Sequence, residues 1–281
     1  MEKIIHYFQT IPSLDRALIL AGGITFFWIL EGIIPLFRFN YNRWKHAGVN
    51  IFFTLTTIAV NFLFAILIVF ASDYSQQHHT GVLQWLHLPL WATIIAGLLI
   101  LDFISAYLIH WIEHKVKWMW KFHMIHHADT HVDTTTANRH HPGESVFRAV
   151  FTLIAVLVSG SPIWLVMMYQ SMSVVFSQFN HANIRFPEKI DKVLRWIIVT
   201  PRMHLIHHHY IRPETDTNYG NIFSFWDRIF RTYHHRATET LNYGLDVFGN
   251  RNDSDIKTLL KLPFDKDIKT DYGAKKSDEN R

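Results

Sequence analysis

Histidines at short, repeated spacings are the residues of this chain whose types and positions are suited to chemistry. The stretch HWIEHKVKWMWKFHMIHH holds a pair four residues apart and then a group spaced by three and one, and MHLIHHHY repeats that second group. Positions i, i+3 and i+4 of a helix share a face, so each group is expected to turn its imidazoles toward one point. Neutral imidazole binds iron, zinc, copper or nickel. The candidate metal ligands and catalytic residues are His110, His114, His123, His126, His127, His204, His207 and His208.

His181 is a ninth candidate ligand, because it ends an apolar segment that returns to the side of the other groups. Nine imidazoles are too many for one tetrahedral zinc and fit two metal ions. Carboxylates are scarce near the groups, so neutral ligands would leave the metals strongly cationic and favour water, hydroxide or an oxygen-derived bridge. Asp102 lies two steps of four residues before His110 on roughly the same stripe. We expect it to orient a ligand imidazole through its second nitrogen; the alternative is a hydrogen bond between helices.

The other histidines divide into two sets. Four lie beside the candidate ligands and are expected to be polar loop residues, with one or two available to bind metal or substrate: His131, His140, His141 and His209. Seven are assigned structural roles: His6, His46, His78, His79, His87, His234 and His235.

The composition indicates a membrane protein. Apolar residues make up 49% of the 281 and charged residues only 18%, below the usual quarter of soluble domains. The formal charge is +4, but Lys and Arg lie mainly between and after long apolar runs, which does not favour nucleic-acid binding. The absence of cysteine excludes disulfides, thiolate metal sites and iron–sulfur clusters. No cleavable signal peptide is evident.

Long apolar runs predict an all-α fold with about four transmembrane helices in a single domain, 1–281. Residues 1–10 are expected to form an interfacial helix, and 264–281 a disordered tail. SGSP should join the last two apolar runs into a helical hairpin that enters and leaves on one side. The expected membrane segments are 17–37, 51–71, 90–109 and the hairpin 146–158 with 163–179.

This topology brings all the candidate ligands to one side of the membrane. Segments 38–50, 110–145 and 180–281 share that side and carry most of the Lys and Arg, whereas 72–89 carries none. The positive-inside rule therefore predicts that a helical, His-rich cap and the C-terminus lie in the cytoplasm. The metals would sit at the membrane surface, above the helix ends.

HWIEH, HMIHH and HLIHH resemble the sterol desaturase and fatty acid hydroxylase superfamily. TNYGNIFSFWDRIFRTY also resembles that family's C-terminal signature, here Asn218, Tyr219, Gly220, Trp226 and Asp227. The resemblance runs from about 90 to 233. One departure is that the first group usually begins His-Arg, whereas this one begins His110-Trp111. The resemblance implies two iron ions in a non-haem centre, O₂ as oxidant, an external electron-transfer protein or reductase, and a lipid substrate from the bilayer.

The implied reaction is hydroxylation of a C–H bond on a fatty acyl chain or sterol-like ring. Desaturation shares the hydrogen abstraction, so the motifs do not separate the two reactions. Zinc is able to replace iron, because imidazoles accept both metals. Trp118, Trp120 and Phe122 are candidates to line the substrate entrance or to anchor the protein at the interface.

Two other functions remain open from the sequence. HWIEH also fits H-x-x-E-H of zinc peptidases, with Glu113 as general base. That interpretation leaves two complete HxxHH groups unexplained. The second alternative is a metal transporter or sensor, although transport sites lie near the bilayer midplane and these groups lie outside the apolar runs. Metal stoichiometry and O₂ consumption separate the three functions.

Overall fold

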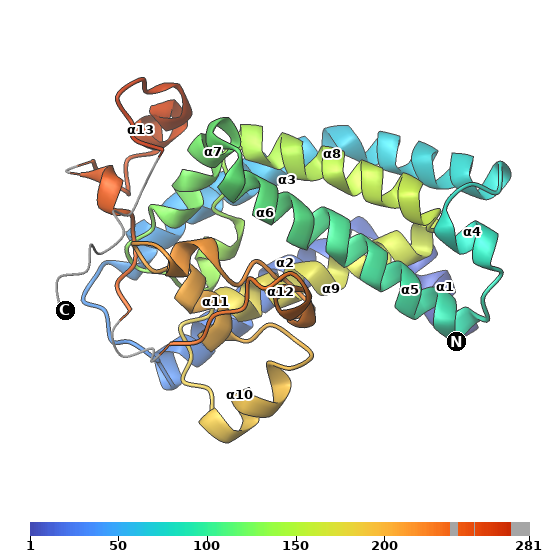
Figure 1. Cartoon of the computed structure of the whole chain (residues 1–281), viewed down its shortest axis with the longest axis horizontal. Helices are drawn as coiled ribbons and strands as arrows, with labels where there is room; N and C mark the ends of the chain where they lie inside the picture. The colour runs from blue at the N-terminus through green and yellow to red at the C-terminus, as the bar shows by residue number, and fades with distance from the viewer. Residues whose placement is uncertain (237–240, 250, 271–281) are drawn as a thin grey trace.

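Long helices form a bundle that carries shorter helices at both ends, most of them at one end (Figure 1). The computed structural model describes residues 1–236, 241–249 and 251–270. Within these ranges it has helices and two isolated β-bridges but no named strand, which confirms the expected all-α class. We call the end that holds His110 the His end, and the other the opposite end.

Helices run between the two ends in alternating directions. α5 continues without a break through the π-helix η1 into α6, so that Leu90–Lys115 forms one span of 26 residues. The helices are α2 (Ser13–Ile33), α3 (Arg43–Gln77), α5 (Leu90–Asp102), η1 (Phe103–Leu108), α6 (Ile109–Lys115), α8 (Pro142–Ser159) and α9 (Ile163–His181).

By length and composition, four helical segments of the described chain are able to cross a membrane: Ser13–Ile33, Arg43–Leu86, Leu90–Lys115 and Pro142–Ser159. This confirms the expected number of spans. Large apolar side chains also cover the outside of the bundle, as at Phe62 (79% exposed) and Leu63 (70% exposed) on α3. Exposed apolar surface on this scale suits contact with lipid rather than water.

The predicted hairpin is formed by α8 and α9, and both its ends lie at the His end. Its turn is tied to the opposite end of the bundle: Ser72 Oγ donates to the carbonyl of Ser161, and the Gln76 and Gln84 amides donate to the carbonyl of Gly160. Gly160 adopts φ +65°, and a Cβ there would lie 2.4 Å from the Thr80 carbonyl oxygen. Glycine is therefore required at this close approach.

Short helices complete the two ends. At the opposite end lie α4 (Val82–Leu86) and α1 (Glu2–Gln9). An interfacial helix was expected over residues 1–10, and α1 packs against α9. The cap at the His end contains α7 (Lys117–His127), η2 (Thr134–Asn138), α10 (Glu188–Leu194), α11 (Pro201–His207), η3 (Glu214–Asp216), α12 (Phe225–Ile229), η5 (Asp246–Phe248), α13 (Ile256–Lys261) and η6 (Leu262–Phe264).

The sequence prediction starts the disordered tail at residue 264, which is too early. Leu262 (2% exposed) and Ile268 (5% exposed) belong to a core with Phe53, Trp120 and Met124, so 264–270 folds onto α3 and α7. The polar residues of this segment conceal one apolar core residue, Ile268, which joins the same core as Leu262 just before the segment. Residues 271–281 lie outside the described part of the chain.

Candidate metal centre

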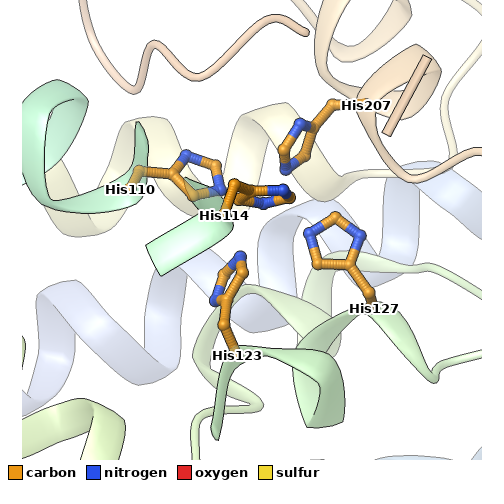
Figure 2. Close-up of side chains that lie close together, drawn as sticks. All are labelled: His110, His114, His123, His127 and His207. Carbon is orange, nitrogen blue, oxygen red and sulfur yellow. The ribbon is translucent and has the colours of Figure 1, made fainter. Parts of the chain in front are cut away.

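Two neighbouring groups of buried imidazoles occupy the His end. All nine candidate ligands belong to them, and within each group the ring nitrogens lie within 4.8 Å of one another. The first group is His110, His114, His123, His127 and His207, whose rings point toward a common centre (Figure 2). The second group is His126, His181, His204 and His208.

Each HxxHH group divides its histidines between the two centres. α7 gives the pair His123 and His127 to the first group and His126 to the second. α11 and its C-cap do the reverse, giving His204 and His208 to the second group and His207 to the first. The expectation that each sequence group faces one point is therefore wrong for the two HxxHH groups, whereas His110 and His114 do share one centre. Adjacent helical residues project about 100° apart, whereas i and i+4 nearly coincide.

Local chain geometry sets the positions of the contributing helices. Val116 is extended, with φ −92° and ψ 106°, so it ends α6 and lets α7 turn back toward it. α11 begins at Pro201, a favoured first helical residue, because its fixed φ suits a helix and its missing N–H has no intrahelical partner there. The π-helix η1 precedes His110; such segments often occur at functional sites.

Protein oxygens hold four of the five rings of the first group by Nδ1. Since the ring nitrogen that bonds to a protein acceptor carries the proton, the other nitrogen is left as a lone-pair donor for a metal. The pairs are His110 with the Tyr219 carbonyl (2.9 Å), His114 with Asp216 Oδ1 (3.3 Å), His123 with Glu144 Oε1 (2.7 Å) and His207 with the Thr217 carbonyl (2.6 Å).

The segment 216–219 supplies three of these acceptors. Thr217 and Tyr219 belong to the predicted C-terminal signature, Asp216 immediately precedes it, and the signature carboxylate Asp227 fixes the path of the segment. Asp227 accepts hydrogen bonds from the Tyr219 and Gly220 amides, at 2.7 and 3.0 Å. Asn218, with φ +55°, donates to the carbonyls of Met203 and His234. The signature is therefore a platform on which ligand imidazoles are oriented.

Asp102 does not orient an imidazole, which corrects the prediction. Its carboxylate accepts from the Ile222 and Phe223 amides, both at 3.3 Å, and from Trp226 Nε1 at 3.0 Å. Eight residues before His110 correspond to about 12 Å along the helix, too far for contact with the same ring. Asp102 and His110 nevertheless face the same 219–226 segment, so Asp102 holds the backbone that holds His110.

The second group has fewer outer partners. His181 donates its Nδ1–H to the Ser177 carbonyl at 2.7 Å, and its Nε2 lies 3.1 Å from the Nε2 atoms of both His126 and His204. Within the described residues, Nδ1 of His126, His204 and His208 is buried without a hydrogen-bond partner. These rings are positioned by packing and by one another.

Burial keeps the cap imidazoles neutral. It lowers the pKa of His123 to about 3, against the opposing effect of Glu144. Burial and neighbouring histidines lower the pKa values of His126, His127, His204, His207 and His208 well below the usual range. Neutral imidazole is the form that binds metal.

The donor set fits two metal ions. Nε2 of His110, His123 and His207, and both ring nitrogens of His127 and His208, are buried and make no hydrogen bond in the described structure. A buried polar atom without a partner is costly, and a shared metal ion would satisfy several at once. All-imidazole surroundings suit iron, zinc, copper or nickel, and do not choose between iron and zinc.

Carboxylates missed by the sequence analysis lie directly behind the ligands. Neither Glu144 nor Asp216 is among the site residues expected from the sequence. Glu144 Oε1 also bonds His140 Nδ1 at 2.6 Å, and the i, i+4 spacing of His140 and Glu144 was a usable signal. The carbonyls of Thr217 and Tyr219 carry no signal in side-chain identity.

Glu113 is not placed as a peptidase base. It is fully buried, and its Oε2 lies 2.6 Å from Arg148 Nη2 and 3.7 Å from His123 Nδ1. Arg148 Nε also lies 3.0 Å from Glu144 Oε1. Glu113 is thus paired with an arginine behind a ligand ring.

The four adjacent histidines contact other side chains or the backbone, and His140 also lies with His123 and Glu144 in a third group that could hold a metal ion. His140 stacks on His126 with ring centroids 4.9 Å apart, and His141 caps α8 by accepting from the Gly143 amide. His131 stacks on Tyr41, and His209 accepts from the Asn242 amide.

Two expected structural or lining assignments differ in detail. His46 is structural as expected, but it is a buried residue paired with Asp129 at 2.8 Å. Trp120 is 1% exposed and packs against His114 and His127. It therefore supports the rings of the first group from inside the protein and does not line a substrate entrance. Trp118, 57% exposed, and Phe122 both pack edge-on against Phe147 on α8.

Comparison with known proteins finds a family match for the segment that holds all nine histidines. Residues 94–232 match the fatty acid hydroxylase family. Ornithine lipid hydroxylase OlsE of Rhizobium tropici is 26% identical over 177 residues, 63% of this chain and 51% of that protein. Alkylglycerol monooxygenase of Caenorhabditis elegans is 29% identical over 142 residues, 50% of this chain and 27% of that protein.

A plant relative shows similar coverage. Methylsterol monooxygenase 2-2 of Arabidopsis thaliana is 24% identical over 165 residues, 57% of this chain and 61% of that protein. The chain therefore matches less than two thirds of the length of each of these three relatives. No solved structure matches the chain significantly.

Proposed function

Because residues 94–232 belong to the fatty acid hydroxylase family, we propose that this membrane protein is an O₂-dependent di-iron monooxygenase that hydroxylates a C–H bond of a membrane lipid. The observation that carries the proposal is the pair of adjacent buried imidazole groups at one end of helices long enough to cross a bilayer. A transport site would be expected near the bilayer midplane, whereas these groups lie at the helix ends.

The overall reaction converts R–H, O₂, two electrons and two protons into R–OH and water. Bound iron would supply the redox chemistry that activates O₂. His110, His114, His123, His127 and His207 would hold one ion, and His126, His181, His204 and His208 the other. Burial of these side chains keeps bulk water from the centre. Four ligand rings are oriented by hydrogen bonds to Asp216, Glu144 and the carbonyls of 217 and 219.

The electrons would come from an external redox protein, because the reaction consumes two and the chain has no cysteine to bind an iron–sulfur cluster. We place the His end on the cytoplasmic side from the distribution of Lys and Arg. The experiment below identifies the class of lipid, whether fatty acyl, sterol-like or other. It also distinguishes hydroxylation from desaturation.

Lipid mass spectrometry of cells with and without this chain tests the activity. We expect a lipid whose mass rises by about 16 Da; a loss of about 2 Da would indicate desaturation instead. His207→Ala should remove the product and serves as the inactive control. Purified protein should hold two metal ions per chain and consume O₂ only with reductant and lipid. Unchanged lipids in cells that contain metal-loaded protein would contradict the proposal.

Glu113→Gln separates this function from a zinc peptidase. A peptidase would need the carboxylate to take a proton from attacking water, so the variant would lose activity while keeping metal. We expect Glu113→Gln to keep both metals and a substantial part of the lipid oxidation, since glutamine still accepts a hydrogen bond from Arg148. A variant with normal metal, no lipid oxidation and the loss of a proteolysis seen in the parent would favour the peptidase.

A further inference from the structure

Arg148 is an arginine within a membrane-spanning helix. It lies six residues after Pro142 on α8, about 9 Å along the helix from the His end. Its side chain is 26% exposed, although both carboxylates that it contacts are fully buried. An ionisable residue at membrane depth is costly and marks a functional site by default.

Two of the three guanidinium nitrogens are used inside the protein. Nη2 donates to Glu113 Oε2 at 2.6 Å, and Nε donates to Glu144 Oε1 at 3.0 Å. Nη1 makes no hydrogen bond with any described residue, and it is not among the fully buried atoms that lack a partner. The exposed part of Arg148 therefore includes a donor that remains available to another molecule.

This donor lies close to the proposed metal centre. Glu144 Oε1, which accepts from Arg148, also accepts from His123 Nδ1 at 2.7 Å. One oxygen thus joins the guanidinium to a ligand ring of the first group. Because Glu113 and Glu144 hold the guanidinium from two directions, its third nitrogen is fixed relative to that ring.

The surroundings of Arg148 are those of a lipid-facing surface. Phe147, the residue before Arg148, packs edge-on against Trp118, which is 57% exposed. Within a bilayer an N–H group without an acceptor is strongly unfavourable. The oxygens that lipids carry beside their acyl chains are ester and amide carbonyls.

We propose that Arg148 Nη1 donates a hydrogen bond to a carbonyl oxygen of an ester- or amide-linked acyl lipid, and so positions that chain against the metal centre. The inference rests on the proposed function. A neutral carbonyl fits better than a phosphate, because the charge of the guanidinium is already paired with the carboxylates of Glu113 and Glu144. Arg148 is then a substrate-binding residue that selects lipids by the linkage of their chains.

A solely structural role for Arg148 makes a different prediction. If the guanidinium only neutralises Glu113 and Glu144, its replacement would weaken the handling of all lipids alike. If Nη1 binds a carbonyl, replacement would affect only lipids that carry one. A pair of lipids with the same chains and head group, one ester-linked and one ether-linked, separates these roles, because an ether oxygen is the poorer acceptor.

The test measures retention of these two lipids by the purified, metal-loaded protein without O₂ or reductant. We expect the parent to retain the ester lipid about tenfold better, the size of one charge-assisted hydrogen bond. Arg148→Lys keeps the charge but cannot span both carboxylates and also donate outward, so it should lose the preference while keeping both metals. Arg139→Lys, at a buried arginine that bonds Asn50 and the Ile125 carbonyl, is the matched control and should keep it.

A double variant guards against misfolding of Arg148→Lys. Arg148→Gln with Glu113→Gln removes one charge of each sign and should likewise bind the two lipids equally. Equal retention by the parent, or an unchanged preference in both variants, would overturn the inference. Binding is measured without turnover, so a missing lipid oxidation would count against the proposed function alone.

Discussion

The two imidazole groups use the same kind of ligand but are supported differently. In the first group, four of five rings donate Nδ1–H to a protein oxygen, two of these oxygens belonging to carboxylates. In the second group, only His181 has such an acceptor within the described chain, the Ser177 carbonyl. The first group is fixed from α6, α7, α8 and the 216–219 segment, whereas the second is fixed mainly by close ring packing.

This difference teaches that ligand spacing alone does not determine how firmly a metal is held. Acceptors behind a ligand ring fix its tautomer and orientation and raise its basicity, and their loss commonly costs 10–100-fold in metal affinity. We therefore expect the first group to hold its ion more tightly. Rings with less directional support tolerate small movements, which suits the ion that exchanges water or substrate.

Removal of one ligand from each group should have the largest effect. His207→Ala and His208→Ala remove adjacent residues that serve different groups. Each should reduce turnover to below about 1% of the parent, because both ions take part in the reaction. Element analysis should show the deficit of metal in both variants.

His78→Ala and His234→Ala are the controls, since neither residue belongs to a group. Full activity after loss of His207 or His126 would refute a centre with two metals.

Acid should act on both groups alike. Three imidazoles of each group lie in the cap, and burial lowers their pKa values, to about 3 for His123. In the unfolded chain they titrate near about 6.5. Below that pH the unfolded state binds more protons, so the stability of metal-free protein should be complete above about pH 7 and fall as pH drops from 6.5 toward 3.

Each such imidazole lowers the free energy of unfolding by roughly 1.4 kcal/mol for each pH unit below its pKa in the unfolded chain. Thermal unfolding of the metal-free protein between pH 8 and pH 5 measures the slope. The exposed His78→Ala should leave the slope unchanged, and a Tm that is constant over this range would show that the cap imidazoles are not held neutral by burial.

Asp216→Asn should reduce the difference in metal affinity between the two groups. The change removes the charge that orients His114 but keeps the size of the side chain. We expect the affinity of the first group to fall by about tenfold and that of the second to stay the same. Retained metal is measured against increasing chelator, and the parent should release its two ions in two steps.

The matched control is Asp265→Asn, which breaks the partly exposed ion pair with Arg251 away from the centre. Release of both ions in one step by the parent would contradict the unequal support of the two groups.

Asp102→Asn should have the smallest effect. Asparagine keeps one acceptor oxygen but loses charge on three hydrogen bonds to the 222–226 segment. We expect a loss of about 1–3 kcal/mol in stability with both metals retained, because Asp102 supports the backbone and not a ring. Chemical denaturation and element analysis measure the two quantities, and selective loss of the first metal would give Asp102 the role originally expected of it.

The sequence was sufficient to identify the nine histidines and the main apolar helices. Spacing of three and four residues reports which side chains share a helix face, and apolar runs report membrane length. Neither reports which helices meet, so the division of His126 from His127 was not predictable. Backbone acceptors such as the Tyr219 carbonyl are common to all residue types, and Asp216 became recognisable only when η3 was placed beside α6.

Glu31, near the end of α2, links the N-terminal helices to the cap. Its carboxylate accepts from the amides of Thr134 and Asn183 and pairs with Arg43 at 3.1 Å, joining both N-terminal spans to the cap. A fragment limited to 94–232 would lack Glu31, so the amides of Thr134 and Asn183 would lose their acceptor. It would also lack α3, which packs in the core of the cap. We therefore expect the cooperative folding unit to extend beyond the family match of 94–232 and to include α2 and α3.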